Sequence, residues 1–362
     1  MKICIVCPYG IDFPGGVWNH ISNLSNQLKI KKIDHLIITP ESKNKPRSYD
    51  NIYQIGKPYN IKSGGSIAPI TLSPFISNKV KNILNTYNPD IVHIHEPFAG
   101  SLPMFFLNHS KSKIVTTFHS NNGTQLYRFG LSKLFNILEK KIDERIVVSE
   151  SAEKYIKKHF KQKYTIIPNG INSELYKTNL IKTKKKSNKL KILFIGREDK
   201  RKGLKYLMNA LKNNNFNFPV KLTIIGHKLS PQNIGNIEIV NPGVVDEQSK
   251  INLLQDSDIL CAPSLGNESF GIILLEAMVS STVIIASNIE GYNSVVTNNE
   301  NGLLIHPRNP KEIFEAINTV YFNKNLKEKI KANGLKFAKE YDWNIISDRI
   351  IDIYLKSKNK SN

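Results

Sequence analysis

The sequence is poor in cysteine. Only three of its 362 residues are cysteines, Cys4, Cys7 and Cys261. Cys4 and Cys7 have the C-x-x-C spacing of metal and redox sites, but both lie in the apolar segment 3–7, and only one further cysteine exists to complete such a site. We interpret all three as core residues of a protein that works in a reducing cytoplasm.

Membrane-spanning and targeting segments are also lacking. No run of about 18 apolar residues occurs, so no transmembrane helix is predicted. The apolar stretch after Lys2 ends at Pro8, which makes it too short for a signal peptide. We therefore expect a cytoplasmic protein, with peripheral attachment to the inner face of a membrane left open.

Acidic residues are in the minority. The chain has 30 Asp and Glu against 51 Lys and Arg, a formal net charge of +21. Such a balance suits nucleic acid, an anionic membrane surface or a phosphate-bearing substrate. Because the excess is spread over both halves and no basic stripe with interleaved aromatic residues is present, nucleic acid is not the expected partner. The abundance of Lys, Asn and Ile is equally typical of an AT-rich genome.

Short apolar runs alternate with helical apolar spacing in two successive series, which is typical of α/β folds with parallel sheets. The first series predicts strands at 3–7, 36–39, 91–95, 113–117, 145–149 and 164–167, and helices at 17–29, 77–87, 131–142 and 151–160. The second predicts strands at 191–195, 221–225, 238–241, 259–261 and 283–286, and helices at 203–211, 248–255, 270–279, 310–322 and 324–340.

The break between the two series sets the domain organisation. A turn at 168–170 is followed by the polar, lysine-rich stretch 178–191, which we interpret as a solvated connector. We predict two Rossmann-like domains whose parallel sheets face a cleft. The first comprises 1–172 together with 345–362, the final helix crossing back, and the second comprises 173–344.

The motif with the most specific spacing is the segment 266–271, which contains Glu268 and is followed by Glu276. Glu268 precedes the predicted helix 270–279, and Glu276 is expected about two turns inside it. A helix N-terminus favours an anion, so a diphosphate can bind there. We expect Glu268 to bind sugar hydroxyls and Glu276 to bind the ribose. The donor-binding backbone N–H groups expected there belong to Ser269, Phe270 and Gly271.

Two cationic residues follow the strand 191–195. Arg197 comes directly after it, and Lys202 lies five positions further along. Together they can neutralise a diphosphate leaving group in place of a metal ion. A solvated loop is the alternative interpretation of a basic pair in so basic a chain.

The first half holds weaker signals. Pro14, Gly15 and Gly16 open the first helix without the G-x-G-x-x-G fingerprint, as either a phosphate or sugar contact or a tight turn. His119 follows a strand, which favours a functional position. His93 and His95 alternate on a strand, but no further ligand set supports zinc, so a structural turn or an acceptor-site wall is preferred.

Taken together, these motifs resemble glycosyltransferase family 4, of the GT-B fold. The likeness covers nearly the whole chain and within the family is strongest to the bacterial phosphatidyl-myo-inositol mannosyltransferases. The resemblance is carried by the segments 7–9, 14–17, 90–97, 117–119, 167–170, and 261–278 with its two glutamates.

The resemblance implies a retaining, metal-independent transferase that uses a nucleotide sugar as substrate and needs no separate cofactor. It implies that Gly15 and Gly16 contact the donor near its diphosphate, that His119 contacts the transferred sugar, and that Arg197 and Lys202 hold the diphosphate. Val245 and Lys250 match the base-recognition segment of guanine-nucleotide users, so GDP-mannose is the favoured donor. A surface helix position is the alternative for Lys250.

The acceptor is less well defined. Pro69, Thr71 and Thr124 stand at or near positions where the inositol-lipid enzymes carry basic residues, and the spacing from Arg197 to Lys202 is one residue shorter. A lipid or a glycan acceptor is therefore expected, and the acceptor-side candidates are Tyr9, Asp12 and Ser120. No side chain stands out as a covalent nucleophile, so we expect front-face transfer in which the departing phosphate deprotonates the acceptor hydroxyl.

Several alternatives remain open at this point. They are a family 4 transferase that uses a UDP-sugar, another GT-B enzyme such as an epimerase or a phosphorylase, and a non-catalytic protein that binds nucleotides or nucleic acid. The segments 77–87 and 126–145 combine apolar positions with lysines, as expected for contact with anionic lipid or for ordinary amphipathic helices.

Overall fold

The computed structural model describes residues 1–12, 15–42, 50–63, 66–120, 132–177 and 188–360. Four of the sequence-based expectations, on Pro14, Thr124, the lysine-rich stretch from 178 to 187 and part of the segment 126–145, lie outside the described residues.

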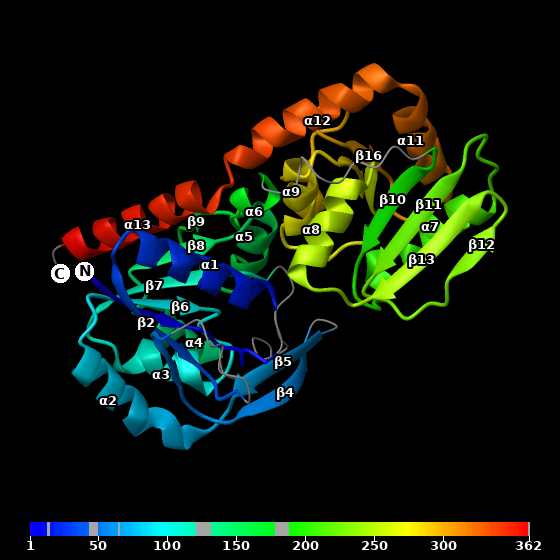
Figure 1. Cartoon of the computed structure of the whole chain (residues 1–362). Helices are drawn as coiled ribbons and strands as arrows, with labels where there is room; N and C mark the ends of the chain where they lie inside the picture. Colours follow the sequence, from blue (N-terminus) through cyan, green and yellow to red (C-terminus); the bar gives the residue numbers. More distant parts are fainter. Residues whose placement is uncertain (13–14, 43–49, 64–65, 121–131, 178–187, 361–362) are drawn as a thin grey trace. The chain divides into compact units, whose positions relative to one another are not determined.

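The chain divides into two compact units (Figure 1). Unit 1 comprises Met1–Gly170 and Trp343–Asn362, and unit 2 comprises Ile171–Asp342. The divisions thus fall at 170/171 and 342/343, against the expected 172/173 and 344/345.

Unit 1 is built on a seven-stranded parallel sheet in the order β3-β2-β1-β6-β7-β8-β9. Its strands are β1 Lys2–Val6, β2 Asp34–Thr39, β3 Ile52–Gln54, β6 Ile91–His95, β7 Lys113–Phe118, β8 Glu144–Val147 and β9 Thr165–Ile166. The strand order reverses between β1 and β6, and ligands of open parallel sheets bind beyond the carboxyl ends of strands at such a switch point.

Helices cover both faces of this sheet. One face carries α1 Gly16–Ile30 and α13 Trp343–Asn359, and the other carries α2 Ser77–Tyr87, α3 Ser101–His109, α4 Ser132–Glu139 and α5 Glu150–Ile156. Because side chains alternate along a strand, Ile3 and Ile5 of β1 pack toward α1 and α13, whereas Cys4 and Val6 pack toward the other face.

The same alternation decides the C-x-x-C pair. Cys4 packs in the cluster on one face of the sheet and Cys7 in the cluster on the other, and all three cysteines are buried free thiols. Burial raises the pKa of the Cys7 thiol to about 12, with a smaller opposing effect of its hydrogen bond to the Tyr9 carbonyl. The two thiols are therefore core groups that face in opposite directions.

Unit 2 has a second seven-stranded sheet, in the order β12-β13-β11-β10-β14-β15-β16, parallel except for the edge strand β12. Its strands are β10 Leu190–Ile195, β11 Val220–Ile225, β12 Gln232–Ile234, β13 Ile237–Gly243, β14 Ile259–Ala262, β15 Val283–Ser287 and β16 Leu303–Ile305. The predicted fold class, two α/β units with parallel sheets, is confirmed.

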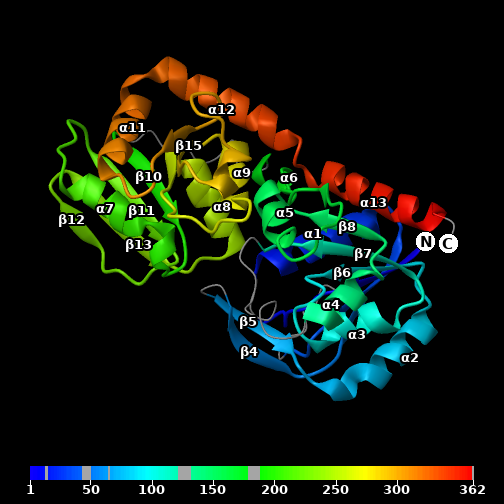
Figure 2. The same ribbon diagram turned by 180° about the vertical axis from the view of Figure 1, so that it is seen from behind.

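The helices of unit 2 are also divided between two faces. The pair α7 Leu204–Lys212 and α11 Pro310–Phe322 packs together on one face (Figure 2). The other carries α8 Glu247–Asp256 and α9 Ile272–Val279, and the C-terminal part of α12 Lys324–Lys339 packs with them. Shorter elements are α6 Glu174–Lys177, α10 Glu290–Asn293 and the 3-10 turn η3 Lys200–Lys202.

Several features of the fold differ from the sequence-based expectations, and the short strands β3, β12 and β16 were among those not predicted. Helix α9 begins at Ile272, not at residue 270, so Glu276 is its fifth residue and lies about one turn inside rather than two. Helix α3 was not predicted, because its sequence SLPMFFLNH is largely apolar and lacks a polar face. The antiparallel hairpin of β4 Pro58–Ser63 and β5 Ser66–Thr71, followed by η1 Pro74–Ile76, was also missed.

A close contact between two backbones fixes the turn after η3. Gly203 has a left-handed φ of 74°, and a Cβ atom there would lie 1.9 Å from the carbonyl oxygen of Pro263. Because a backbone atom cannot yield as a flexible side chain can, only glycine fits. This contact holds the turn that carries Lys202 against the loop that follows β14.

We expect Gly203→Ala to lower the stability of unit 2 by about 3 kcal/mol or more, because it combines a left-handed alanine with a backbone clash. Gly235→Ala is the matched control, since Gly235 has a φ of 58° with nothing within 4 Å of a Cβ, and its cost should stay near 1 kcal/mol. Differential scanning calorimetry of both variants measures the difference. Equal shifts of the unfolding midpoint would contradict this account of Gly203.

Candidate active site

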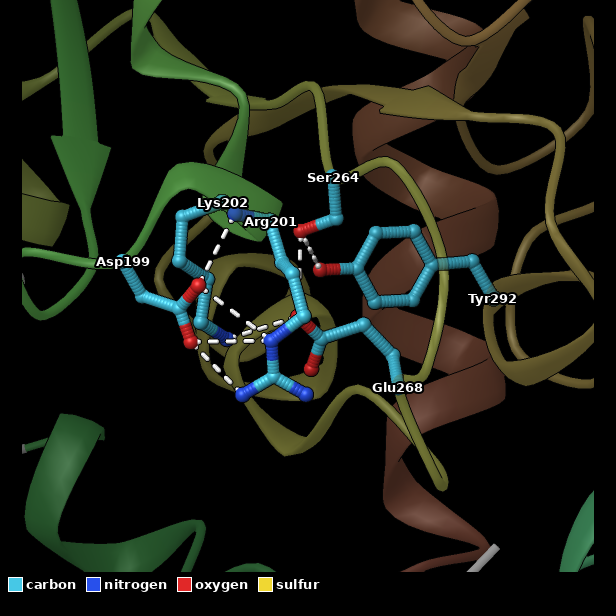
Figure 3. Close-up of polar contacts among 6 residues, drawn as sticks. All are labelled: Asp199, Arg201, Lys202, Ser264, Glu268 and Tyr292. Carbon is cyan, nitrogen blue, oxygen red and sulfur yellow. Dashed lines mark hydrogen bonds and ion pairs between the residues drawn. The ribbon is translucent and has the colours of Figure 1, made fainter. Parts of the chain in front are cut away.

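The first part of the candidate site is the turn that follows β10. Asp199 caps η3 by accepting a hydrogen bond from the backbone N–H of Arg201 at 2.9 Å. Its carboxylate also accepts from Nε of Arg201 at 2.9 Å and from Nη2 at 2.6 Å (Figure 3). This two-point pair fixes the guanidinium and the turn together, and Lys202 is the next residue along the chain.

Lys202 meets Glu268 from the loop after β14. Nζ of Lys202 donates to Oε1 of Glu268 at 2.7 Å, and Oγ of Ser264 donates to the same oxygen at 3.1 Å. Ser264 in turn lies 3.0 Å from the hydroxyl of Tyr292, which belongs to α10 (Figure 3). Lys202 and Glu268 are partly exposed, whereas Ser264 and Tyr292 are buried. A partly exposed ion pair contributes little to stability, and both side chains keep some solvent-accessible surface.

The loop that carries Glu268 has an unusual backbone. Gly266, Asn267 and Gly271 all have positive φ values, 143°, 60° and 80°. Gly271 is the N-cap of α9, and a Cβ atom there would lie 2.8 Å from the ring of Tyr292. Gly271 is thus required both by its left-handed backbone conformation and by the ring of Tyr292 that lies against it.

The expected position of the segment 269–271 at the start of a helix needs correction. The helix starts at Ile272, so the N–H groups of Ser269, Phe270 and Gly271 belong to the preceding loop and the N-cap rather than to the first turn of the helix. The side chain of Phe270 is buried in the core of unit 2 and is not available to a ligand.

Glu276 lies in a second charged group. Nζ of Lys250 donates to Oε1 of Glu276 at 2.8 Å and pairs with Glu247 at 2.9 Å. Burial raises the pKa of the Glu276 carboxyl, and the Lys250 ammonium acts in the opposite direction. Asp246 positions the lysine by capping α8 through the N–H of Ser249, at 2.7 Å. The lysine therefore offsets part of the cost of burying the Glu276 carboxylate.

Val245 and Arg197, two further predicted site residues of unit 2, differ in their exposure to solvent. Val245 is partly buried against the core of unit 2 just before α8. Arg197 is exposed, and its guanidinium makes no hydrogen bond or ion pair with any residue in the described part of the chain. The stem of Lys202 packs beside Gly196, where a Cβ would lie 3.1 Å from its Cγ. Sequence reasoning paired Arg197 with Lys202, and the structure gives Lys202 a carboxylate partner and leaves Arg197 in solvent.

In unit 1, His119 lies at the carboxyl end of β7 within a group of buried histidines. Its Nε2 lies 2.9 Å from Nδ1 of His95, and one of the two nitrogens carries the shared proton. His93 bonds Tyr354 of α13, and His20 of α1 lies edge-on to both His95 and His119. Within the described residues, no group of three or more His, Cys, Asp or Glu side chains is arranged to hold a metal ion.

Glu96 fixes the backbone beside His119. Its Oε1 accepts hydrogen bonds from the N–H groups of His119, at 2.7 Å, and Ser120, at 2.9 Å. Burial raises the pKa of the Glu96 carboxyl although these hydrogen bonds lower it. Both residues lie at the carboxyl ends of β6 and β7, on the side of the sheet where the strand order predicts a ligand.

The other residues expected in unit 1 are placed as follows. Gly15 is the extended N-cap of α1, and nothing lies within 4 Å of a Cβ built on Gly16. Tyr9 is half-buried and pairs through its backbone with Ile70 of β5. Asp12 accepts a hydrogen bond from the hydroxyl of Ser42 at 2.5 Å.

Several residues of the site were not identified from the sequence. Ser264 and Tyr292 carry no motif of their own, and the Asp199–Arg201 pair is a local structural contact. The signal for the histidine group was present, because His93 and His95 alternate along a strand and so share one face.

Both halves of the chain match known glycosyltransferase families. Residues 14–175 match the model of Glycosyltransferase Family 4, and residues 177–337 match that of Glycosyl transferases group 1. The phosphatidyl-myo-inositol mannosyltransferase of Mycobacterium tuberculosis is 31% identical, over 98% of this chain and 96% of that protein. The same enzyme from Mycolicibacterium smegmatis is 30% identical, over 98% and 93%.

The chain belongs to glycosyltransferase family 4.

Solved structures give the same fold for this glycosyltransferase. A glycosyltransferase from Rickettsia africae matches with a TM-score of 0.79 at 21% identity, covering 99% of both chains. Anabaena HepE in complex with UDP-glucose matches with a TM-score of 0.73 at 16% identity, covering 98% of this chain and 100% of that one. The enzyme therefore has the GT-B fold.

The buried histidines of unit 1 lead us to expect a glycosyltransferase that loses stability in acid. Burial lowers the pKa of His20 to about 4 and that of His93 to about 3, from an ordinary value of 6.5. It also lowers the pKa of His95 and His119. The unfolded state therefore binds more protons below about pH 6.5, and stability falls as the pH decreases from there, by up to about 1.4 kcal/mol per pH unit for each histidine.

We expect the urea midpoint of unit 1 to change little between about pH 8 and 7 and to fall steeply between about pH 6.5 and 5. Glu96 acts in the opposite direction because its pKa is raised, but it is one group against these four histidines and His35, whose pKa is also lowered by burial. Both tryptophans, Trp18 and Trp343, belong to unit 1, so tryptophan fluorescence reports its unfolding. A midpoint that is unchanged down to about pH 5 would show that these histidines are not held neutral.

Proposed function

We propose that this glycosyltransferase transfers mannose from GDP-mannose to a hydroxyl of a lipid or glycan acceptor, with retention of the anomeric configuration. The observation that carries the proposal is the pair of carboxylates in unit 2 that each have a lysine partner, Glu268 with Lys202 and Glu276 with Lys250. The identity of 30–31% with mannosyltransferases over 98% of the chain supports the choice of sugar.

The chemistry of the first pair fits a nucleotide sugar. A carboxylate close to a pyrophosphate is costly unless a cation stands between them or the carboxylate binds hydroxyls. Lys202 supplies the cation, and Glu268 can accept from the hydroxyls of the transferred sugar. Arg197, which is exposed, adds a second positive charge for the leaving pyrophosphate. The proposal gives Lys202 and Arg197 the role that a divalent metal plays in other transferases.

The second pair suits the nucleoside. Glu276 can accept hydrogen bonds from the ribose hydroxyls, and Lys250, the fourth residue of α8, can reach a carbonyl of the base. Guanine presents its carbonyl at a place where uracil does not, which is why we favour GDP. The alternative donor is a UDP-sugar, for which Lys250 would serve only to balance the charge of Glu276.

The residues of unit 1 complete the assignment. His119 is given a contact with the transferred sugar, and Gly15 and Gly16 a backbone contact with the donor. Tyr9, Asp12 and Ser120 are candidates for the acceptor side. We infer front-face transfer, in which the departing phosphate oxygen takes the proton of the acceptor hydroxyl and the new glycosidic bond forms on the face from which the phosphate leaves.

The donor assignment can be tested by thermal shift. A ligand that binds only the folded state raises the unfolding midpoint, and we expect GDP-mannose to raise it by several degrees and UDP-glucose to leave it nearly unchanged. The reverse order would overturn the choice of GDP. No shift with any nucleotide sugar would contradict the proposed function.

Site-directed variants test whether the proposed donor-binding residues are also needed for sugar transfer. Glu268→Ala and Lys202→Ala should each reduce mannose transfer by at least about 100-fold, as expected for groups that act on the leaving pyrophosphate and the sugar. Lys324→Ala, on the first turn of α12, is a matched control for the loss of one positive charge in unit 2. Full activity in either active-site variant would exclude that residue from the site.

We also propose that unit 1 binds anionic membranes. Among the described residues, no helix is long and apolar enough to cross a bilayer. The apolar positions Val80 and Leu84 of α2 are buried in the core, so the membrane-facing group must be other residues. Phe75 is 89% exposed in the turn before α2, and Lys79 and Lys81 are exposed on the helix. An apolar side chain next to lysines is suited to an anionic lipid surface.

Vesicle flotation tests this surface. We expect the protein to float with phosphatidylcholine vesicles that contain phosphatidylglycerol and not with pure phosphatidylcholine, and Phe75→Ser to reduce the bound fraction roughly tenfold. Phe322→Ser, which alters an exposed phenylalanine of unit 2, is the control and should float like the wild type. Absence of flotation at low salt would end the membrane proposal.

A further inference from the structure

We propose that Tyr292 and Ser264 form a hydroxyl relay that orients Glu268 toward the transferred sugar. The two residues would then be positioning residues that set the affinity for the sugar part of the donor. This inference rests on the proposed function, because it takes Glu268 to be the sugar ligand.

The direction of each hydrogen bond in the relay follows from the inventory of donors. An ionised carboxylate can only accept, so Oγ of Ser264 donates its single proton to Oε1 of Glu268. The serine oxygen then has only lone pairs left for Tyr292, so the tyrosine hydroxyl must donate to it across the 3.0 Å contact. Burial raises the pKa of Tyr292, which keeps its hydroxyl protonated as this arrangement requires.

Two glycines hold the backbone of the relay independently of its hydroxyl groups. A Cβ atom on Gly291 would lie 1.8 Å from the carbonyl oxygen of Glu268, so α10 rests directly on the loop. The ring of Tyr292 also lies against Gly271 at the start of α9. The packing thus positions the Glu268 backbone, and the hydroxyl groups position its carboxylate (Figure 3).

The relay has a distinct role because Lys202 is shared. Lys202 and Ser264 both donate to Oε1 of Glu268. When a pyrophosphate attracts Lys202, the Glu268 carboxylate loses the hydrogen bond that Lys202 donates to its Oε1 atom. A buried serine, itself fixed by a buried tyrosine, keeps the carboxylate in the same orientation at that moment. The relay therefore separates the binding of sugar from the binding of phosphate.

Calorimetric titration with GDP-mannose and with GDP tests the inference. Ser264→Ala should weaken the affinity for GDP-mannose about tenfold and Tyr292→Phe about threefold, as expected for the loss of one hydrogen bond to a charged group and of one neutral hydrogen bond. The affinity for GDP, which has no sugar, should change less than twofold in both variants. The titrations are repeated with UDP-glucose and UDP so that a wrong base does not hide the effect.

Two controls separate positioning from general damage. Tyr321→Phe removes a tyrosine hydroxyl from α11, where the ring stacks on Phe218, and should leave both affinities and the unfolding midpoint unchanged. In a Glu268→Ala background, Tyr292→Phe should have no further effect on sugar affinity, because the relay would act only through that carboxylate.

The outcomes distinguish the two levels of inference. If both relay variants bind the nucleotide sugar as tightly as the wild type while Glu268→Ala does not, the relay is wrong and the sugar site stands. Equal losses for the nucleotide sugar and the free nucleotide would show a general distortion and also overturn the relay. If Glu268→Ala binds the nucleotide sugar like the wild type, the sugar role of Glu268 fails, and the relay fails with it.

Discussion

The contact between the turn after β10 and the loop after β14 is the constraint on which the site depends. Lys202 and Glu268 are far apart in sequence and meet only because Gly203 allows the two backbones to touch at Pro263. Strands β10 and β14 are neighbours in the sheet, so their carboxyl ends deliver both loops to the same edge. The order of the strands brings the two loops together, and the absence of a side chain at Gly203 sets the distance between their backbones.

The sequence was sufficient for the fold but not for the local contacts. Helix α2 and helix α11 were predicted with their observed bounds, because each has a clear apolar face between turn residues. Helix α3 was missed because its sequence is apolar on all sides, and the start of α9 was misplaced because a left-handed glycine cap leaves no periodic signal. Hydrophobic periodicity reports only which face of a segment packs on the core. It therefore gives no signal for a helix that lacks a polar face, or for a glycine cap at the start of a helix.

The site residues divide in the same way, into those predicted from the sequence and those that only the structure reveals. Glu268, Glu276 and Lys202 were predicted as site residues from the sequence, whereas their hydrogen-bond partners depend on long-range packing that spacing does not encode. Lys250 was expected to contact a base, and in the structure its ammonium lies between the carboxylates of Glu247 and Glu276. Tyr292 and Ser264 lie 28 positions apart and have no shared motif, so only the folded chain reveals them.

The chain leaves unit 1 at Gly170 and returns to it at Trp343, so that unit 2 is an insertion within unit 1. Helix α13 supplies Trp343, Ile346 and Ile350 to the core on one face of the first sheet. During synthesis, this face stays uncovered until α13 has left the ribosome, and by then unit 2 is already complete in sequence. The second unit is therefore able to form before the first is closed.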